Sequence, residues 1–156
     1  MAEINWNRCG NLDETTSIMA IENKELLLKD LCGRLPYDCI VSVAEGGTNG
    51  IQWDDVTLNP YLLYQITEED AWEYVKPYLR QMEDMTEEEC DMVEVILGDE
   101  NIFDFMRNGD IILKEGNFTQ AMLSRLYDYF NSIHVDYRGL IPKGLANVAP
   151  EGMYNN

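Results

Sequence analysis

The stretch that decides the fold is Asn23–Val43, NKELLLKDLCGRLPYDCIVSV. Its first part predicts an amphipathic helix over residues 23–35, because leucines recur every fourth residue at Leu27, Leu31 and Leu35. Two further residues, Leu28 and Cys32, widen this apolar face, whereas the charged residues fall mostly elsewhere: Lys24, Glu25, Lys29 and Asp30. The pattern therefore predicts a helix that packs one side against a core, with Asn23 as a plausible N-cap.

The second part of this stretch predicts the end of the helix and the start of a strand. Gly33 weakens the last helical turn and Pro36 cannot continue the helix. Residues 39–44 are then apolar and partly β-branched, as is typical of a strand. This helix-to-strand unit is expected to be the nucleus of the fold.

Length and composition indicate a folded, water-exposed protein. The chain has 156 residues, of which 46% are hydrophobic, enough to bury a substantial core. No apolar run approaches the ~18 residues that a membrane-spanning helix needs, and no basic segment followed by an apolar one marks an export signal near residue 1. We therefore expect a cytoplasmic protein whose four cysteines stay reduced.

The net charge of −18 is concentrated in the middle of the chain. Residues 68–104 contain 14 acids and 2 bases, a net of −12, whereas residues 105–156 contain five of each. Direct binding to nucleic acid through a broad basic surface is excluded, because that requires clustered Lys and Arg, and anionic membranes are disfavoured for the same reason. A basic protein partner is compatible with this charge.

The part of the chain after the first strand predicts a small sheet. GGTNG at residues 46–50 indicates a turn, and residues 51–53 resume an extended pattern that Asp54 and Asp55 are expected to break. Asn59-Pro60 indicates another turn, and residues 61–66, YLLYQI, predict a further short strand. Residues 38–66 are thus expected to form an antiparallel meander or a partly closed barrel.

The acidic middle contains two candidate helix starts. TEED at residues 67–70 resembles a capping box that opens a short helix ending at Pro77, and TEEE at residues 86–89 is a better match. The second helix is predicted to end at Gly98. The acids are therefore expected to serve mainly as capping residues and a solvated face.

The last third predicts one strand and the longest helix. Residues 111–113 are a candidate strand, and Asn117 with Gln120 is expected to open a helix over residues 117–132. The apolar stripe of this helix is wide, which implies that it is largely buried. Together these patterns predict an α+β fold in a single domain, with the sheet packed by the 23–35 and 117–132 helices in a common core.

The predicted domain spans residues 19–150, between a polar extension at residues 1–18 and a polar tail at residues 151–156. Its acidic residues form the main candidate interaction surface, which comprises Glu68, Glu69, Asp70, Glu83, Asp84, Glu87, Glu88, Glu89 and Asp91. The chain has one histidine, and its cysteine spacings fit no zinc motif, so no metal or other cofactor is expected.

One cluster has the residue types of an acid–base site. His134 is the sole imidazole, and Asp136, Tyr137 and Arg138 follow it closely. The structural interpretation is the stronger one, with Asp136 capping a short helix, Tyr137 packing in the core and Arg138 pairing with a carboxylate. These four residues are weak catalytic candidates, and the sequence favours a non-enzymatic protein.

Four blocks of the sequence carry a resemblance: NKELLLKDLCGRLPY at 23–37, VKPYLRQMEDMTEEE at 75–89, HVDYRGLIPKGLA at 134–146 and APEGMY at 149–154. They resemble a family of small uncharacterised proteins that is widespread in gut anaerobic bacteria, their prophages and mobile elements. Where this chain has QMEDM at 81–85, the family commonly has Pro-Met-Ser-Ser-Met, so part of the acidity belongs to this member alone. The resemblance implies a phage or mobile-element accessory protein. It implies nothing about an activity, a cofactor or a ligand.

Three functions follow as hypotheses. The first is a non-enzymatic interaction module that presents its acidic surface to a basic protein. The second is an inhibitor whose carboxylates imitate the phosphates of a nucleic acid and occupy the basic groove of a DNA-binding protein or nuclease. The third is an enzyme centred on the His134 cluster. The pattern leaves the oligomeric state open.

Overall fold

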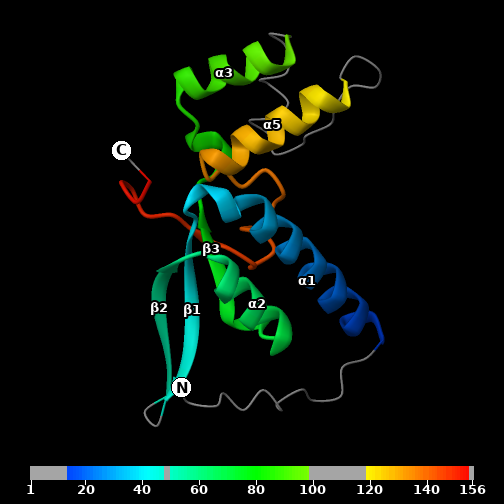
Figure 1. The fold of residues 1–156 in the computed structure, drawn as a ribbon, viewed down its shortest axis with the longest axis vertical. Coiled ribbons are helices and arrows are strands. Elements are labelled where there is room, and N and C mark those ends of the chain that lie inside the picture. Colours follow the sequence, from blue (N-terminus) through cyan, green and yellow to red (C-terminus); the bar gives the residue numbers. More distant parts are fainter. Residues whose placement is uncertain (1–13, 48–49, 99–118, 155–156) are drawn as a thin grey trace. The chain divides into compact units, whose positions relative to one another are not determined.

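A computed structural model describes residues 14–47, 50–98 and 119–154 (Figure 1). The fold class is α+β, as predicted. In chain order, the elements are α1 (Glu14–Arg34), η1 (Leu35–Tyr37), β1 (Ile40–Gly47), β2 (Gly50–Thr57), α2 (Pro60–Glu68), η2 (Trp72–Tyr74), β3 (Val75–Leu79), η3 (Met82–Asp84), α3 (Glu87–Leu97), α5 (Gln120–Ser132) and β4 (Asn147–Val148), where η denotes a 3-10 helix.

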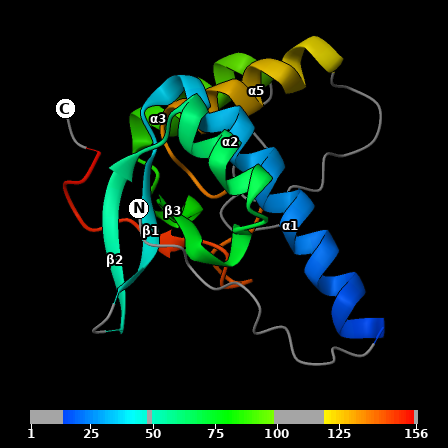
Figure 2. The same cartoon turned by 60° about the horizontal axis from the view of Figure 1, so that its bottom comes forward.

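The strands form one sheet in the order β2-β1-β3-β4. Strand β1 pairs antiparallel with β2 through a register in which Gly47 faces Gly50, and it pairs antiparallel with β3 on its other side. Gly46, Gly47 and Gly50 of the predicted turn belong to the paired ends of β1 and β2, and Gly50 has a φ of 111°, which favours glycine. Figure 2 shows β2 beside β1, on the side of β1 away from β3.

The chain divides into two compact units. The first comprises residues 1–78 with 145–147, and the second comprises residues 79–144 with 148–156. The first unit buries apolar side chains from α1, β1, α2 and η2, namely Leu27, Leu31, Val41, Ile66 and Trp72. Lys24 of α1 forms an ion pair with Asp70, after α2, and lies over the Trp72 ring.

The second unit has its own core between α3 and α5, which lie side by side in both views (Figures 1 and 2). Its buried members are Val93, Ile96, Leu97, Leu126, Phe130 and Tyr137, and partly buried methionines and tyrosines pack around them. Thus the N-terminal helix contributes to the core of the first unit and the C-terminal helix to that of the second.

Helix α1 differs from its prediction in both extent and faces. It begins at Glu14, so Asn23 is not its N-cap and residues 14–18 of the predicted extension are helical. Asp30 is fully buried, because both of its carboxylate oxygens accept hydrogen bonds from Arg34, at 2.7 and 3.1 Å. Cys32, by contrast, is exposed. Asp30, which was predicted to face solvent, is thus buried in an ion pair with Arg34, four residues later in the same helix.

The segment between residues 54 and 76 contains the largest errors of prediction. Strand β2 runs through Asp54 and Asp55 to Thr57. Residues 61–66 are helical, because Asn59 caps α2 by accepting a hydrogen bond from the Leu62 backbone N–H at 2.9 Å and Pro60 occupies the first turn.

The predicted helix start at residues 67–70 is instead the end of α2, and the chain enters the short η2 and then β3 where a helix was expected. Helix α5 is shorter than α1 and has Thr119 as its N-cap, with the Thr119 hydroxyl accepting from the Met122 backbone N–H. The predicted cap at Asn117 and the strand at 111–113 lie outside the described residues.

Candidate functional site

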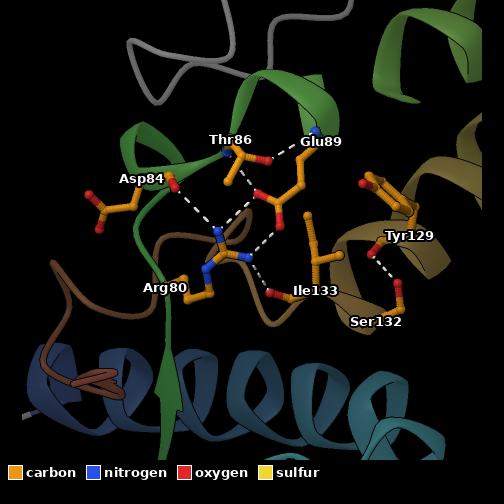
Figure 3. A network of polar contacts seen from close by, with 7 residues as sticks. All are labelled: Arg80, Asp84, Thr86, Glu89, Tyr129, Ser132 and Ile133. Atoms are coloured by element: carbon orange, nitrogen blue, oxygen red, sulfur yellow. Dashed lines mark hydrogen bonds and ion pairs between the residues drawn. The ribbon is translucent and has the colours of Figure 1, made fainter. Parts of the chain in front are cut away.

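The main polar network of the second unit is built around Arg80 (Figure 3). Its guanidinium forms a bidentate ion pair with Glu89, in which the Nη1–Oε1 and Nη2–Oε2 distances are 2.8 and 2.9 Å. It also donates to the backbone carbonyl oxygens of Ile133, at 3.0 Å, and Asp84, at 3.2 Å. Arg80 thereby joins η3, the start of α3 and the end of α5.

Glu89 has a second role as the third residue of α3. The Glu89 backbone N–H donates to the Thr86 hydroxyl at 3.2 Å, and the Thr86 backbone N–H donates to the Glu89 carboxylate at 2.9 Å. This reciprocal arrangement is the capping box predicted from TEEE. The Glu89 side chain therefore points toward Arg80 and the start of α3, and it is less exposed than the neighbouring acids.

The electrostatics of the network follow from this geometry. Burial raises the pKa of Glu89, but the hydrogen bonds from Arg80 and the Thr86 backbone, together with the charge of Arg80, lower it overall below its ordinary value. The hydrogen bond to Glu89 raises the pKa of Arg80. Burial, followed by the negative charge of Glu89, raises the pKa of Tyr129, whose carbonyl accepts from Ser132. The pair is thus held in its charged state.

The backbone of Arg80 also fixes the segment that contains the catalytic candidates. The Arg80 N–H donates to the His134 carbonyl, and the Asp136 N–H donates to the Arg80 carbonyl, both at 2.8 Å. These bonds form an isolated parallel bridge between Arg80 and Val135. His134 has a φ of 61° and is buried, and its ring stacks on Tyr154 at a centroid distance of 3.7 Å.

The other members of the cluster have structural partners. Asp136 Oδ1 accepts from the Leu140 N–H at 2.8 Å and Oδ2 from the Ile141 N–H at 2.9 Å, so this carboxylate stabilises a turn. Tyr137 donates its hydroxyl to Asn131 at 3.1 Å.

Aromatic contacts complete the surroundings of Tyr137. Its ring stacks on Tyr127, and the Arg138 guanidinium lies 4.7 Å from its centroid. The four catalytic candidates therefore lie in one short segment, and these contacts stabilise that segment.

The acidic candidates separate into two groups. Glu68, Glu69 and Asp70 lie in the first unit, at and after the end of α2. The others lie in the second unit, where all but Glu89 are exposed: Glu83, Asp84, Glu87, Glu88 and Asp91. The Asp84 carboxylate points away from Arg80 (Figure 3). Between residues 81 and 98 the sequence has seven acids and no Lys or Arg.

The outward side of α3 carries apolar residues as well as acids. Met92 is 45% exposed and Val95 is 74% exposed. At spacings of three and four residues, they share one side of the helix with Glu88 and Asp91. We call the surface formed by Glu87, Glu88, Asp91, Met92 and Val95 the acidic α3 face.

Sequence reasoning missed two features of this site. Arg80 could have been noticed, because it is one of two bases in residues 68–104, but its contact with Ile133 joins residues 53 apart in sequence. Met92 and Val95 could have been placed outside the core, since they fall off the face defined by Cys90, Val93 and Leu97.

Among the described residues, no group of three or more His, Cys, Asp or Glu side chains is arranged to hold a metal ion. Within the same part of the chain, no helix is both long and apolar enough to cross a membrane. Comparisons of the chain with protein-family models, with curated proteins and with solved structures found no match. The family resemblance of the sequence blocks therefore stays a prediction.

Proposed function

We propose that this protein is a non-enzymatic interaction module that binds a basic protein through the acidic α3 face. The observation that carries the proposal is the position of Met92 and Val95, which are exposed beside acids on a helix whose other side is buried. A face that served only solubility would need the charges and not the exposed apolar side chains.

The two kinds of side chain have different roles in such a contact. Carboxylates uncompensated by bases attract a cationic partner over a distance of about one Debye length, ~8 Å in physiological salt, and raise the association rate. The apolar side chains supply short-range affinity once water is excluded between the two surfaces. A partner that fits this face has Lys or Arg residues around a small apolar centre.

The setting that we propose follows from the sequence resemblance. An accessory protein of a phage or mobile element acts in the cytoplasm of its host, where basic nucleic-acid-binding proteins are abundant. A protein of this class is consequently the first partner to seek. Imitation of a nucleic acid is a special case of the same proposal, in which the carboxylates occupy the partner's phosphate-binding groove.

The test compares two charge-reversal variants in a pull-down from host lysate. Glu88→Lys/Asp91→Lys changes the acidic α3 face, and Glu68→Lys/Glu69→Lys makes the same change in net charge on the first unit. Partners that wild type and the control retain should be lost from the first variant, and their capture should weaken from 50 mM to 500 mM salt. Far-UV circular dichroism checks that both variants remain folded.

Further measurements distinguish binding through this face from binding through net charge, and imitation of a nucleic acid from another contact. Equal loss of partners from both variants would show that net charge, and not this face, governs binding, and would overturn the proposal. For a captured nucleic-acid-binding protein, competition with duplex DNA separates the two versions. Displacement by DNA indicates imitation of a nucleic acid, and resistance to DNA indicates a contact elsewhere on the partner. Substitution Val95→Lys should weaken the same partners if the apolar centre contributes.

A further inference from the structure

A second surface lies in the first unit, along strand β2. All residues of β2 are exposed, including Ile51 at 65%, Trp53 at 45% and Val56 at 38%. In contrast, the neighbouring strand β1 buries Val41 and Ala44. Among the described residues, β2 occupies the end of the sheet order and pairs with β1 alone. Strand β2 is therefore an edge strand with large apolar side chains exposed to solvent.

The hydrogen-bond pattern shows which backbone groups of β2 point away from the sheet. The Leu58 N–H donates to the Cys39 carbonyl at 2.8 Å, which marks a hydrogen-bonded pair in the β1–β2 register. Antiparallel pairs alternate between hydrogen-bonded and non-hydrogen-bonded positions. The N–H and C=O groups of residues 51, 53, 55 and 57 therefore point outward, and these four residues present a ladder to an added strand.

The charge around this edge favours a cationic occupant. From residue 35 to residue 75 the sequence contains eight acids and no Lys or Arg. Asp54 and Asp55 are exposed on β2 itself, one on each face of the strand, and the exposed Glu45 is paired with Gln52. An extended segment with basic residues can thus meet the Asp54 carboxylate on one face of the strand. On the other face, Asp55 has a hydrogen bond with Tyr78, and the Trp53 ring can accept a cation.

The same charges disfavour a second copy of this chain. Antiparallel self-pairing centred on residue 53, 54 or 55 places Asp54 or Asp55 directly or diagonally opposite its own counterpart. Like charges at these positions destabilise a strand pair. Acidic side chains on an exposed edge are also a recognised means of preventing edge-to-edge aggregation.

We propose that β2 binds an extended segment of a partner protein as an added fifth strand of the sheet. In this segment, Lys or Arg alternates with β-branched apolar residues. Main-chain hydrogen bonds to residues 51, 53, 55 and 57 provide affinity, and the side chains of β2 select the sequence. This proposal is independent of the acidic α3 face, because it uses another unit and another set of residues.

The probe is the fluorescently labelled peptide Lys-Val-Lys-Val-Lys-Val-Lys, with binding measured by fluorescence anisotropy against the full chain. A second peptide has the same side chains but N-methylated amides at its five central residues, so it keeps the charge and loses ladder hydrogen bonds. We expect N-methylation to weaken binding by at least about tenfold, which corresponds to ~1.4 kcal/mol. Equal binding of both peptides would show charge attraction only and would overturn the proposal, as would no binding of the parent peptide.

Two measurements on the protein complete the test. Asp54→Lys/Asp55→Lys should weaken the parent peptide at least about fivefold, whereas the equally charged control Glu68→Lys/Glu69→Lys should stay within about twofold. Amide hydrogen exchange should slow at residues 51, 53, 55 and 57 on binding, because these amides acquire acceptors. Exchange that slows elsewhere, or a protein dimer that the peptide dissociates, would overturn the proposal in favour of another site or of a second copy.

Discussion

Removal of Arg80 should destabilise the second unit by far more than removal of an ordinary surface charge. The substitution Arg80→Ala deletes two hydrogen bonds to Glu89 and one each to the carbonyls of Ile133 and Asp84. Exposed ion pairs contribute ~0.2–1 kcal/mol, and breaking a fully buried pair costs about 3–5 kcal/mol. Since the two side chains are 21% and 19% exposed, we expect a loss of about 2–3 kcal/mol.

A double-mutant cycle isolates the ion pair from the carbonyl contacts. Glu89→Gln keeps a side-chain oxygen for the Thr86 backbone N–H, so the capping box can persist. We expect this change to cost about 1 kcal/mol and the pair to show a coupling energy of about 1–2 kcal/mol. Strict additivity of Arg80→Ala and Glu89→Gln would refute the assignment of the pair as the centre of this network.

The assay exploits the distribution of aromatic residues. Trp53 and Trp72 lie in the first unit, whereas the sequence from residue 79 to the end contains tyrosines and no tryptophan. Tyrosines occur in both units, so a tyrosine signal does not separate them. Amide hydrogen exchange in α3 and α5, followed at increasing urea concentration, reports on the second unit. Tryptophan fluorescence supplies the comparison with the first unit. A loss of less than about 0.5 kcal/mol for Arg80→Ala would refute the reasoning.

The same pair predicts a pH dependence with a defined sign. The folded-state pKa of Glu89 lies below its ordinary value of 4.5, so the unfolded chain binds more protons between these two values. The stabilisation is therefore fully present above pH ~5.5 and is lost as pH falls through the folded-state pKa. The stability difference between wild type and Glu89→Gln should shrink on acidification. A difference that grows as pH falls would contradict the lowered pKa.

Three further substitutions test local features. Arg34→Met should lower the free energy of unfolding by about 3–5 kcal/mol, because it leaves the buried Asp30 carboxylate without this cation. The double change Asp30→Leu/Arg34→Met should recover at least half of this loss. Urea unfolding followed by tryptophan fluorescence measures both values. Thr86→Ala should destabilise the second unit by about 1 kcal/mol in the amide-exchange assay, and Thr86→Ser by much less, because the hydroxyl accepts from the helix backbone. Asn59→Ala should lower stability by about 1 kcal/mol, with Asn59→Asp close to wild type in thermal unfolding, and an unchanged alanine variant would show that the cap is dispensable.

Signals with a local mechanism were predicted well from the sequence. The TEEE capping box at residues 86–89 and the stop at Gly98 depend on side-chain and backbone groups within a few residues of each other. The reversal of the chain near residues 46–50 was likewise expected from the glycines, although Gly46, Gly47 and Gly50 themselves lie in paired strands. Each of these features requires only the residue types at a fixed spacing, which the sequence contains in full.

Signals that admit two local structures were predicted less well. Residues 61–66 form a short apolar run, which periodicity alone cannot assign to helix or strand. The decisive information was in Asn59-Pro60, which can be a turn or an N-cap followed by the first helical residue. Once that helix is placed, the acids at 68–70 belong to its end, and the capping-box interpretation of TEED fails.

The partners of two charged residues were not predicted, for different reasons. Asp30 carries a charge and falls off the leucine stripe, so its sequence position indicates solvent, yet Arg34 allows its burial. Arg80 meets a carbonyl oxygen 53 residues away, and no local pattern contains that contact. Arg34 lies within reach of Asp30 along α1, and only the burial of the pair depends on the tertiary fold. For Arg80, the tertiary fold also provides the position of the partner.

The acids of the second unit illustrate why composition alone does not define a surface. One carboxylate, Glu89, is sufficient to complete the capping box and to pair with Arg80. The fold therefore does not require the exposed Glu88 and Asp91, although acids in a first turn also favour the helix dipole. An exposed methionine and an even more exposed valine, four and seven residues after Glu88, add apolar surface beside these acids. It is this combination of surplus charge with exposed apolar surface on one side of α3, and not the net charge of −18, that supports binding as the role of the face.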